Sequence, residues 1–292
     1  MQRLIVYLMT LAMTAGGFAA RAAGDTKAEQ LMAQARAALG GEKNLNKVQG
    51  LTATGAYQRT LPDRQLSGEL TIDLQLPDKL LRTESMSPMG DMSIITEQGL
   101  NGETLLRHQR TLNAPPGMVI RMGAAPTGDA EAQAIRNARA DLARTALAFL
   151  LTSPASLPLE FSAGGEAESD EGKADVIDVK GAGNFTARLL LDRKSHRPLM
   201  LMYRGVAPRV MIQTQQGPPP DGGRGRGEPP HDAPAAPQVV DITLYLDDYK
   251  SIDGVMLPHH MARSVDGKPT EDITFKTIKI NPAFKADAFA AK

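Results

Sequence analysis

The sequence contains no cysteine and no tryptophan, and aromatic residues make up only 4% of its 292 residues. The absence of cysteine excludes disulfide bonds, thiolate metal ligands and a lipid-modified N-terminal cysteine. Lysine and arginine balance aspartate and glutamate, 33 against 33, so the net charge gives no basis for binding nucleic acid. After the N-terminus, no stretch reaches the roughly 18 apolar residues of a transmembrane helix. What remains to be interpreted is the N-terminal segment and the spacing of apolar residues.

Residues 1–22 have the composition of a secretory signal peptide. Arg3 is an early base, an apolar run extends from residue 4 to residue 20, and Ala20, Arg21 and Ala22 form a small-residue cleavage pattern. The run is short and interrupted by threonine and glycine, which favours cleavage; an uncleaved N-terminal anchor is the alternative. We therefore expect secretion to the periplasm and a mature chain that forms a single domain over residues 24–292.

Two segments have the apolar spacing of amphipathic helices. A capping box beginning at Thr26 predicts the start of the first, and Gly40 follows its last apolar residue. The second covers residues 129–151, where apolar side chains recur at steps of three and four. Its last turns, residues 146–151, are apolar on every side, so protein or ligand must cover that end.

Most of the remaining chain alternates apolar and polar residues with a period of two, which is typical of antiparallel strands with one wet face. The clearest case is residues 66–76, where Leu70, Ile72 and Leu74 alternate with polar side chains. The alternation slips near Thr277, which predicts a β-bulge. The expected strands are residues 51–60, 66–76, 79–85, 94–97, 103–109, 159–162, 174–180, 185–192, 198–204, 210–215, 240–247, 256–264 and 270–280.

Residues 217–238 interrupt this pattern with seven prolines and five glycines, and contain no aromatic or β-branched residue. Such a segment cannot bury enough apolar surface to offset its chain entropy. Because strands are predicted on both sides, we expect a disordered Pro/Gly-rich loop inside one domain. Arg224 and Arg226 alternate with glycine as in RNA-binding tracts, but no aromatic side chain accompanies them for stacking, which favours a solvated loop.

The histidines do not form a convincing metal site. Only His259 and His260 are adjacent, and a strand directs adjacent side chains to opposite faces. Sharing a metal would require a bulge between them.

The acidic clusters are better explained by turns than by chemistry. Glu166, Glu168, Asp170 and Glu171 lack the ligand spacing of a calcium loop and are expected at a hairpin tip. The adjacent acidic residues at 247 and 248 are interpreted as the end of a strand in preference to a catalytic pair. No nucleophile-elbow, zinc-protease or phosphate-loop pattern appears in the sequence. We therefore predict that the protein is not an enzyme and has no catalytic residues, cofactor or metal.

The order of these elements resembles that of the periplasmic outer-membrane lipoprotein-sorting carriers, the LolA/LolB-like superfamily. The resemblance lies in residues 68–82, which include LPDKLLR, in residues 94–105, which include NGETL, and in residues 253–289, which include DGVMLP and FKTIKINP before Phe284 and Phe289. It implies the α+β class and an incomplete, half-open antiparallel β-barrel with helices forming a lid. It also implies a hydrophobic cavity of lipid size between sheet and lid.

One position departs from the pattern of these carriers. They have an arginine immediately before the proline that closes the second strand of the meander, where it helps to hold the lid shut. Here Leu76 precedes Pro77. Arg82 is near but belongs to the following strand, so the role is not transferred to it.

The expected function is that of a periplasmic carrier that binds lipid or lipoprotein and shields acyl chains in a hydrophobic cavity. Its partners would be acyl chains and a membrane-anchored donor or acceptor protein, and not nucleic acid. The alternative is an envelope sensor on the same fold that binds a protein partner without carrying lipid. A packed core would account for the candidate lining residues equally well. Those candidate lipid-binding residues are Leu70, Ile72, Leu74, Leu142, Phe149, Ile242 and Leu244.

Overall fold

A computed structural model describes residues 21–61, 64–89, 91–114, 126–169, 172–206 and 238–291. The predicted signal peptide up to residue 20, the predicted strand at 210–215 and residues 217–237 of the predicted loop lie outside these ranges. The helices are α1 (Arg21–Ala38), α2 (Glu42–Leu45) and α3 (Asp129–Leu150). The strands are β1 (Gly50–Thr60), β2 (Gln65–Gln75), β3 (Lys79–Met89), β4 (Met92–Asn101), β5 (Thr104–Leu112), β6 (Leu159–Ser169), β7 (Gly172–Gly181), β8 (Phe185–Asp192), β9 (Pro198–Val206), β10 (Val239–Ile252), β11 (Val255–Val265) and β12 (Lys268–Ile280).

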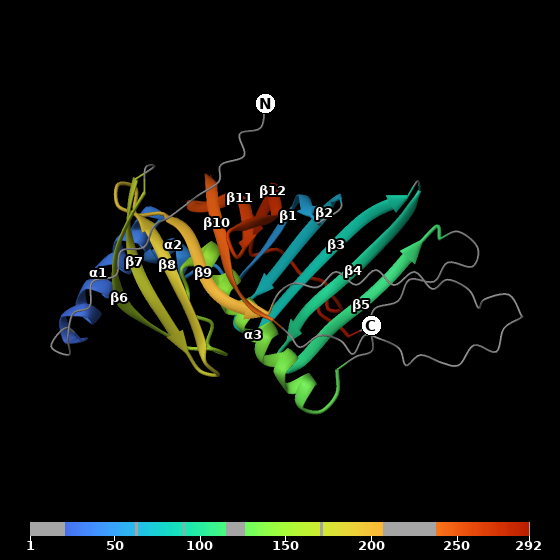
Figure 1. Cartoon of the computed structure of the whole chain (residues 1–292), viewed down its shortest axis with the longest axis horizontal. Coiled ribbons are helices and arrows are strands. Elements are labelled where there is room, and N and C mark those ends of the chain that lie inside the picture. Colours follow the sequence, from blue (N-terminus) through green and yellow to red (C-terminus); the bar gives the residue numbers. More distant parts are fainter. Residues whose placement is uncertain are drawn as a thin grey trace, which may run out of the picture.

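The strands form one antiparallel sheet in the order β5-β4-β3-β2-β1-β12-β11-β10-β9-β8-β7-β6. Consecutive strands are neighbours except for β5 and β6, which form the two edges, and at the centre β1 pairs with both β2 and the non-consecutive β12. In the described part of the chain, the edge strands β5 and β6 do not pair with each other. Because these edges are not paired, the curved sheet forms a half-open barrel (Figure 1). This confirms the predicted α+β fold class.

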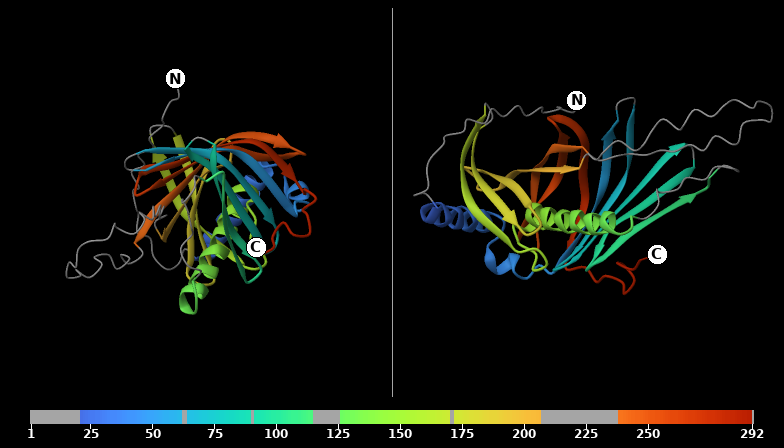
Figure 2. Two further views of the ribbon diagram at one scale, coloured as in Figure 1. Left: turned by 90° about the vertical axis from the view of Figure 1, so that its right-hand side faces the viewer. Right: turned by 60° about the horizontal axis from the view of Figure 1, so that its bottom comes forward.

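Helix α3 follows edge strand β5 and precedes edge strand β6 in the chain. Its 22 residues are long enough to extend about 33 Å at 1.5 Å per residue. The helix crosses the concave side of the sheet and so lies across the opening of the barrel (Figure 2). This connection places α3 over the inner face.

The bulge predicted near Thr277 is confirmed. Thr54 of β1 pairs with Thr277 of β12, whereas the next residue, Gly55, pairs with Phe275, so Lys276 is the extra residue. A Cβ at Gly55 would lie 2.1 Å from the carbonyl oxygen of Thr274, so no larger side chain fits here. Bulges increase local twist, and this one bends the centre of the sheet.

Helix α1 already includes Arg21, the first described residue, which corrects the predicted start at Thr26. The residues before Thr26 include two alanines, the strongest helix formers, and they extend the helix backwards past the predicted capping box. At its other end, the guanidinium group of Arg36 donates a hydrogen bond to the carbonyl oxygen of Leu151, at 2.6 Å. This contact joins α1 to the C-terminal end of α3.

Two predictions about acidic residues were wrong. Strand β10 continues to Ile252, so Asp247 and Asp248 do not end it; Asp248 adopts a left-handed φ of 49° inside the strand. Glu166 and Glu168 lie within β6, because ion pairs hold them in the sheet, Glu166 with Arg193 at 2.6 Å and Glu168 with a lysine of β7 at 3.2 Å. Residues 170 and 171 lie outside the described ranges.

The C-terminal motif that contributed to the sequence resemblance has a clear structural role. The side chain of Asn281 accepts a hydrogen bond from the backbone of Gln49 at 2.6 Å and donates one to the carbonyl of Lys47 at 2.9 Å. Phe284 and Phe289 then pack edge to face, with ring centroids 5.1 Å apart. Together with Leu81 and Leu106, Phe289 forms a small apolar cluster outside the barrel. The chain end thus covers the outer face of β3 and β5.

Candidate functional site

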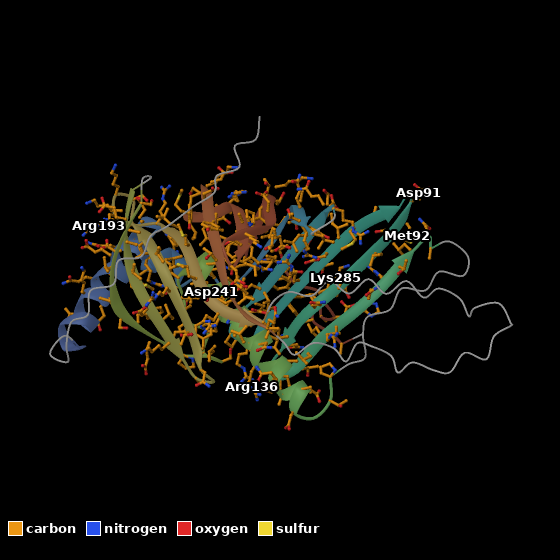
Figure 3. All side chains as sticks on the ribbon, viewed as in Figure 1. Asp91, Met92, Arg136, Arg193, Asp241 and Lys285 are labelled. Carbon is orange, nitrogen blue, oxygen red and sulfur yellow. The ribbon has the colours of Figure 1, made fainter. Side chains whose placement is uncertain are left out.

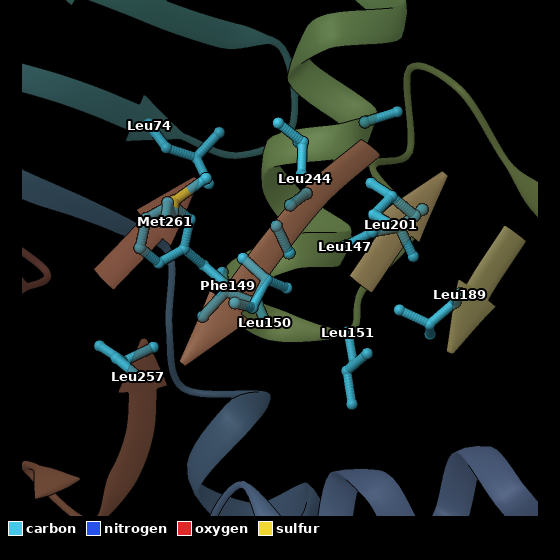
Figure 4. Close-up of a cluster of buried hydrophobic side chains, with 14 of the residues drawn as sticks. Leu74, Leu147, Phe149, Leu150, Leu151, Leu189, Leu201, Leu244, Leu257 and Met261 are labelled. Carbon is cyan, nitrogen blue, oxygen red and sulfur yellow. The ribbon is translucent and has the colours of Figure 1, made fainter. Parts of the chain in front are cut away.

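The concave face of the sheet and the second half of α3 form the main hydrophobic core. From Leu142 onward, α3 is buried at almost every position. Figure 4 shows Leu147, Phe149 and Leu150 of α3 lying among Leu201 and Leu244 of the strands. Phe149 also packs against Phe275 of β12, with ring centroids 5.7 Å apart. The core therefore lies between α3 and the inner face of the sheet, and α1 adds Leu31 and Ala35 to the same cluster.

The structure brings the predicted lining residues together in this region. All seven are buried, with exposed fractions between 0% and 7%. Six belong to the same apolar cluster, and the exception, Ile242, is a neighbour of Tyr203 in the register of β9 and β10. Side chains fill the space between them. Their contact with a lipid stays a prediction, which requires α3 to move away from the sheet.

The first half of α3 is held much less firmly than the second. Residues 129–133 are exposed, and residues 134–141 are exposed or half-buried. Arg136 belongs to this exposed half (Figure 3) and contacts only its helical neighbour Gln133 in the described hydrogen bonds. Arg139 forms an ion pair with Glu103, which lies in the turn between β4 and β5. The helix is thus anchored at its C-terminal end and lightly tethered at its N-terminal end.

A group of five charged side chains, here called the arginine cluster, lies on the concave face beside the apolar core. It comprises Arg59, Arg82, Arg263, Glu84 and Glu271. The guanidinium group of Arg59 lies 2.8 Å from Glu84 and 2.6 Å from Glu271, and that of Arg82 lies 2.7 Å and 2.8 Å from the same two carboxylates. Arg263 lies 3.5 Å from the second oxygen of Glu271. Four strands contribute to this cluster.

Both glutamates of the cluster are ionised at neutral pH. Glu271 is buried, and although burial raises its pKa, the guanidinium groups of Arg82, Arg263 and Arg59 lower it to about 2. Burial also raises the pKa of Glu84, but Arg82 and Arg59 lower it below the ordinary value. Three arginines therefore face two carboxylates, which leaves one positive charge in excess.

Several polar atoms of this region are buried without a hydrogen-bond partner in the described structure. They are the hydroxyl of Tyr57, Nε of Arg263 and Oε2 of Glu271. Burial raises the pKa of Tyr57 to about 12, so its hydroxyl keeps its proton and remains a donor. Two donors and one acceptor on the concave face of the described structure are thus unsatisfied, and each normally costs free energy.

Helix α3 contacts β9 through Arg144. Its guanidinium group stacks over the ring of Tyr203, 3.9 Å from the centroid, and forms an ion pair with Asp141 at 2.7 Å. Burial raises the pKa of Tyr203, whereas Arg263 and Arg144 act in the opposite direction. Tyr203 therefore connects β9 to the helix through Arg144.

Sequence reasoning missed this cluster. The available signal was the presence of charged residues in the apolar phase of alternating strands, such as Arg59 two residues after Tyr57 and Arg82 two residues after Leu80. Arg82 was singled out only as the residue near the position where the sorting carriers have an arginine. The structure places it on the concave face, in contact with two carboxylates.

The two adjacent histidines point to opposite faces of β11, as predicted. His259 is buried, and its Nδ1 lies 3.0 Å from the carbonyl oxygen of Leu257. His260 bridges neighbouring strands, with Nδ1 2.9 Å from Asp247 and Nε2 3.0 Å from Asp272. Among the described residues, no group of three His, Cys, Asp or Glu side chains is placed to hold a metal ion.

A pocket of about 130 Å³ lies away from the predicted lining residues. Its walls include Lys173, Ala174, Met200 and Tyr245. Ala174 and Met200 belong to a second apolar cluster that is separate from the main core. At this volume the pocket is smaller than the roughly 300–1,000 Å³ of typical ligand sites. In the described part of the chain, no helix is long and apolar enough to cross a bilayer.

Comparison with known proteins gives structural similarities only. The sequence matches no protein-family model and no curated protein. Among solved structures, a LolA superfamily protein from Nitrosomonas europaea has a TM-score of 0.46 at 9% identity, covering 90% of this chain and 96% of that one. A putative outer membrane lipoprotein-sorting protein domain from Vibrio parahaemolyticus has a TM-score of 0.45 at 11% identity, with coverages of 92% and 97%. A DUF1329 family protein from Desulfovibrio piger has a TM-score of 0.43 at 8% identity, with coverages of 90% and 96%. The names of the first two proteins refer to the LolA superfamily or to lipoprotein sorting, as the sequence resemblance does. At these TM-scores and identities, the similarities carry no argument about function.

Proposed function

We propose that this protein is a carrier that shields acyl chains of a lipid or lipoprotein between the concave face of its sheet and α3. The proposal rests on the way α3 covers the concave face of the sheet. One helix joins the two edge strands of an open sheet, and it is buried in its second half and exposed in its first. Such a helix can act as a lid, because it can leave the sheet without breaking any strand pairing.

The chemistry of the covered face suits a hydrocarbon chain. In the lid-open state, the acyl chain would contact the five predicted lining residues of the strands in place of the side chains of the helix, which include Leu142 and Phe149. Each buried methylene contributes about 0.8 kcal/mol, so a chain of about 16 carbons supplies up to about 12 kcal/mol before ordering costs. That is the scale needed to offset exposure of the apolar face of α3.

The direction of transfer would follow from the same balance. A partner that binds the apolar face of α3 would favour the open state and promote loading of the lipid, whereas transfer of the lipid to an acceptor would let α3 close again. We propose a periplasmic location, by virtue of the predicted signal peptide, and a membrane-anchored protein as donor or acceptor. No nucleic-acid partner and no catalytic step form part of the proposal.

The chain offers a direct test, because it contains no cysteine. Replacing Arg139 and Glu103 by cysteine introduces a unique pair where α3 is tethered to the β4–β5 turn. A short bis-maleimide crosslinker would then fix the helix to the sheet. We expect the uncrosslinked variant to bind a fluorescent fatty acid, and the crosslinked variant to lose that binding.

The matched controls are the two single-cysteine variants, alkylated with a monofunctional maleimide. They should bind the fatty acid as the unmodified protein does. Unchanged binding after crosslinking would contradict the lid, and absence of binding in the unmodified protein would contradict the carrier. In the latter case, recovery of a membrane-anchored regulator on immobilised protein would favour the sensor.

A further inference from the structure

We propose that the arginine cluster binds the anionic headgroup, a carboxylate or a phosphate, of the lipid whose acyl chain lies under α3. This inference rests on the proposed carrier function and names the class of ligand. The proposal rests on an excess of guanidinium groups beside the apolar face and on two hydrogen-bond donors that have no partner in the described structure.

The arginine cluster has an excess of positive charge. The two carboxylates are already shared between Arg59 and Arg82 at distances of 2.6–2.8 Å. Arg263 has only a longer contact of 3.5 Å with Glu271, and its side chain is 25% exposed. A guanidinium group held in a partly desolvated place is costly unless an anion accompanies it. The structure therefore provides a cation with incomplete compensation inside the barrel.

Two hydrogen-bond donors near the apolar face have no partner among the described residues. Nε of Arg263 and the hydroxyl of Tyr57 are both buried and have no hydrogen-bond partner in the described structure. Tyr57 is 1% exposed, and its ring also carries Arg59, whose guanidinium carbon lies 5.2 Å from the centroid. A carboxylate or phosphate offers several acceptor oxygens and suits a planar guanidinium group. One such group would satisfy donors that the protein leaves open.

The arginine cluster lies next to the predicted acyl site. In the sheet register, Arg263 lies opposite Leu244, and Glu84 lies opposite Leu70. Directly opposed side chains in an antiparallel sheet are about 4.5–5.5 Å apart at Cβ. The charged and apolar parts of the concave face are thus contiguous. This arrangement matches a ligand with an anionic end and a hydrocarbon tail.

The test compares ligands that share a tail and differ in the headgroup. Isothermal titration calorimetry with laurate, with dodecanol and with acetate separates the contribution of the tail from that of the anion. We expect the intact protein to bind laurate about tenfold or more tightly than dodecanol, and to bind acetate weakly. The variant Arg263→Met should lose the preference for laurate and keep its affinity for dodecanol.

The matched control is Arg188→Met. Arg188 also has one carboxylate neighbour, Asp178 at 2.9 Å, but in the register of β8 it alternates with the buried inner residue Leu189 and so lies on the other face. The control should keep the preference for laurate. Tyr57→Phe, which retains the ring, should reduce the preference several-fold and guards against a folding defect in the first variant.

Each alternative result has a distinct meaning. Equal binding of laurate and dodecanol by the intact protein would overturn the headgroup site and leave the carrier function standing, with water as the partner of the free donors. A preference that survives Arg263→Met would also overturn it. Tight, Arg263-dependent binding of acetate with no gain from the tail would assign the site to a free anion. Failure of both laurate and dodecanol to bind would overturn the carrier function and this inference together.

Discussion

The guanidinium group of Arg36 and the carbonyl oxygen of Leu151 are joined by a hydrogen bond of 2.6 Å, which links α1 to the end of α3. Leu151 has a left-handed φ of 49° and terminates the helix. The last carbonyl groups of a helix lack intrahelical partners and carry partial negative charge, so a cation there is favourable. Arg36 is also paired with Glu42, which fixes its position. The anchored end of the proposed lid thus depends on a residue 115 positions earlier in the chain.

Removing this contact should weaken the whole domain. We expect Arg36→Ala to reduce the free energy of unfolding by about 1–3 kcal/mol, because a carbonyl next to the core loses a charged donor. Urea unfolding followed by circular dichroism measures the change. Arg136→Ala, on the exposed half of α3, serves as the control and should change the stability by less than about 0.5 kcal/mol. Equal effects of the two substitutions would show that the link is unimportant.

Hydrogen exchange should divide α3 into two parts. Amide protons of residues 129–140 should exchange well before those of residues 143–150, because the first half has few buried contacts. Mass spectrometry of peptic fragments reports the difference. A uniform rate along the helix would contradict the description of α3 as anchored at one end only.

The core side of α3 should be sensitive to truncation. Phe149 is fully buried against Phe275, so Phe149→Ala is expected to lower the free energy of unfolding by about 3–5 kcal/mol through lost burial and a new cavity. Val239 is 57% exposed, and Val239→Ala should have little effect. Denaturant titration compares the two. A loss below about 1 kcal/mol for Phe149→Ala would mean that the packing around it is loose.

His260 should make stability dependent on alkaline pH. Its hydrogen bond to Asp247, aided by Asp272 and opposed by burial, raises its pKa from 6.5 to about 9. A raised pKa in the folded state means that the charged histidine stabilises the fold fully below pH 6.5, and that this contribution disappears as the pH rises through about 9. The stability difference between the native protein and His260→Gln should shrink over that interval.

Nuclear magnetic resonance provides a direct check on this prediction. The imidazole protons of His260 should titrate with a midpoint near 9, and Asp272→Asn should lower the midpoint. A midpoint near 6.5 in the native protein would show that the two carboxylates do not hold the histidine in solution.

Glu271 should act in the opposite pH range. Its pKa falls from 4.5 to about 2 in the folded protein, so its stabilising effect is present above pH 4.5 and is lost as the pH falls towards 2. Glu271→Gln should cost about 3–5 kcal/mol at neutral pH, because it leaves buried guanidinium groups uncompensated. Adding Arg263→Met should recover part of the loss, and strict additivity of the two substitutions would argue against their coupling.

Local patterns in the sequence predicted much of the architecture. A strand was predicted at the position of each of the twelve described strands and a bulge near Thr277, because each of these features depends on neighbours in the chain. Some strands were predicted too short: β4 was predicted at residues 94–97 and extends over Met92–Asn101, and β6 was predicted at residues 159–162 and continues to Ser169. Its second half contains Glu166 and Glu168, whose charges are compensated by partners that the sequence pattern does not reveal.

The arginine cluster could not be assembled in the same way. Arg59 and Glu271 are separated by 212 positions and meet only because β1 pairs with β12. Which strands become neighbours is set by the packing of the whole sheet, and a periodicity of two carries no information about it. The start of α1 was missed for a simpler reason, since its preceding alanines extend the helix beyond an acceptable cap.

The central position of β1 also determines the order in which the protein can be completed. Synthesis from the N-terminus delivers β1 to β5 first as a local hairpin series, but the other edge of β1 has no partner until residues 268–280 are made. For most of biogenesis, a long row of unpaired amide and carbonyl groups is available for pairing with a foreign strand. Any product that stops before β12 would have two half-sheets that are not paired with each other, and the free edge of β1 could pair with another chain. Completion of the sheet therefore depends on the last strand of the chain.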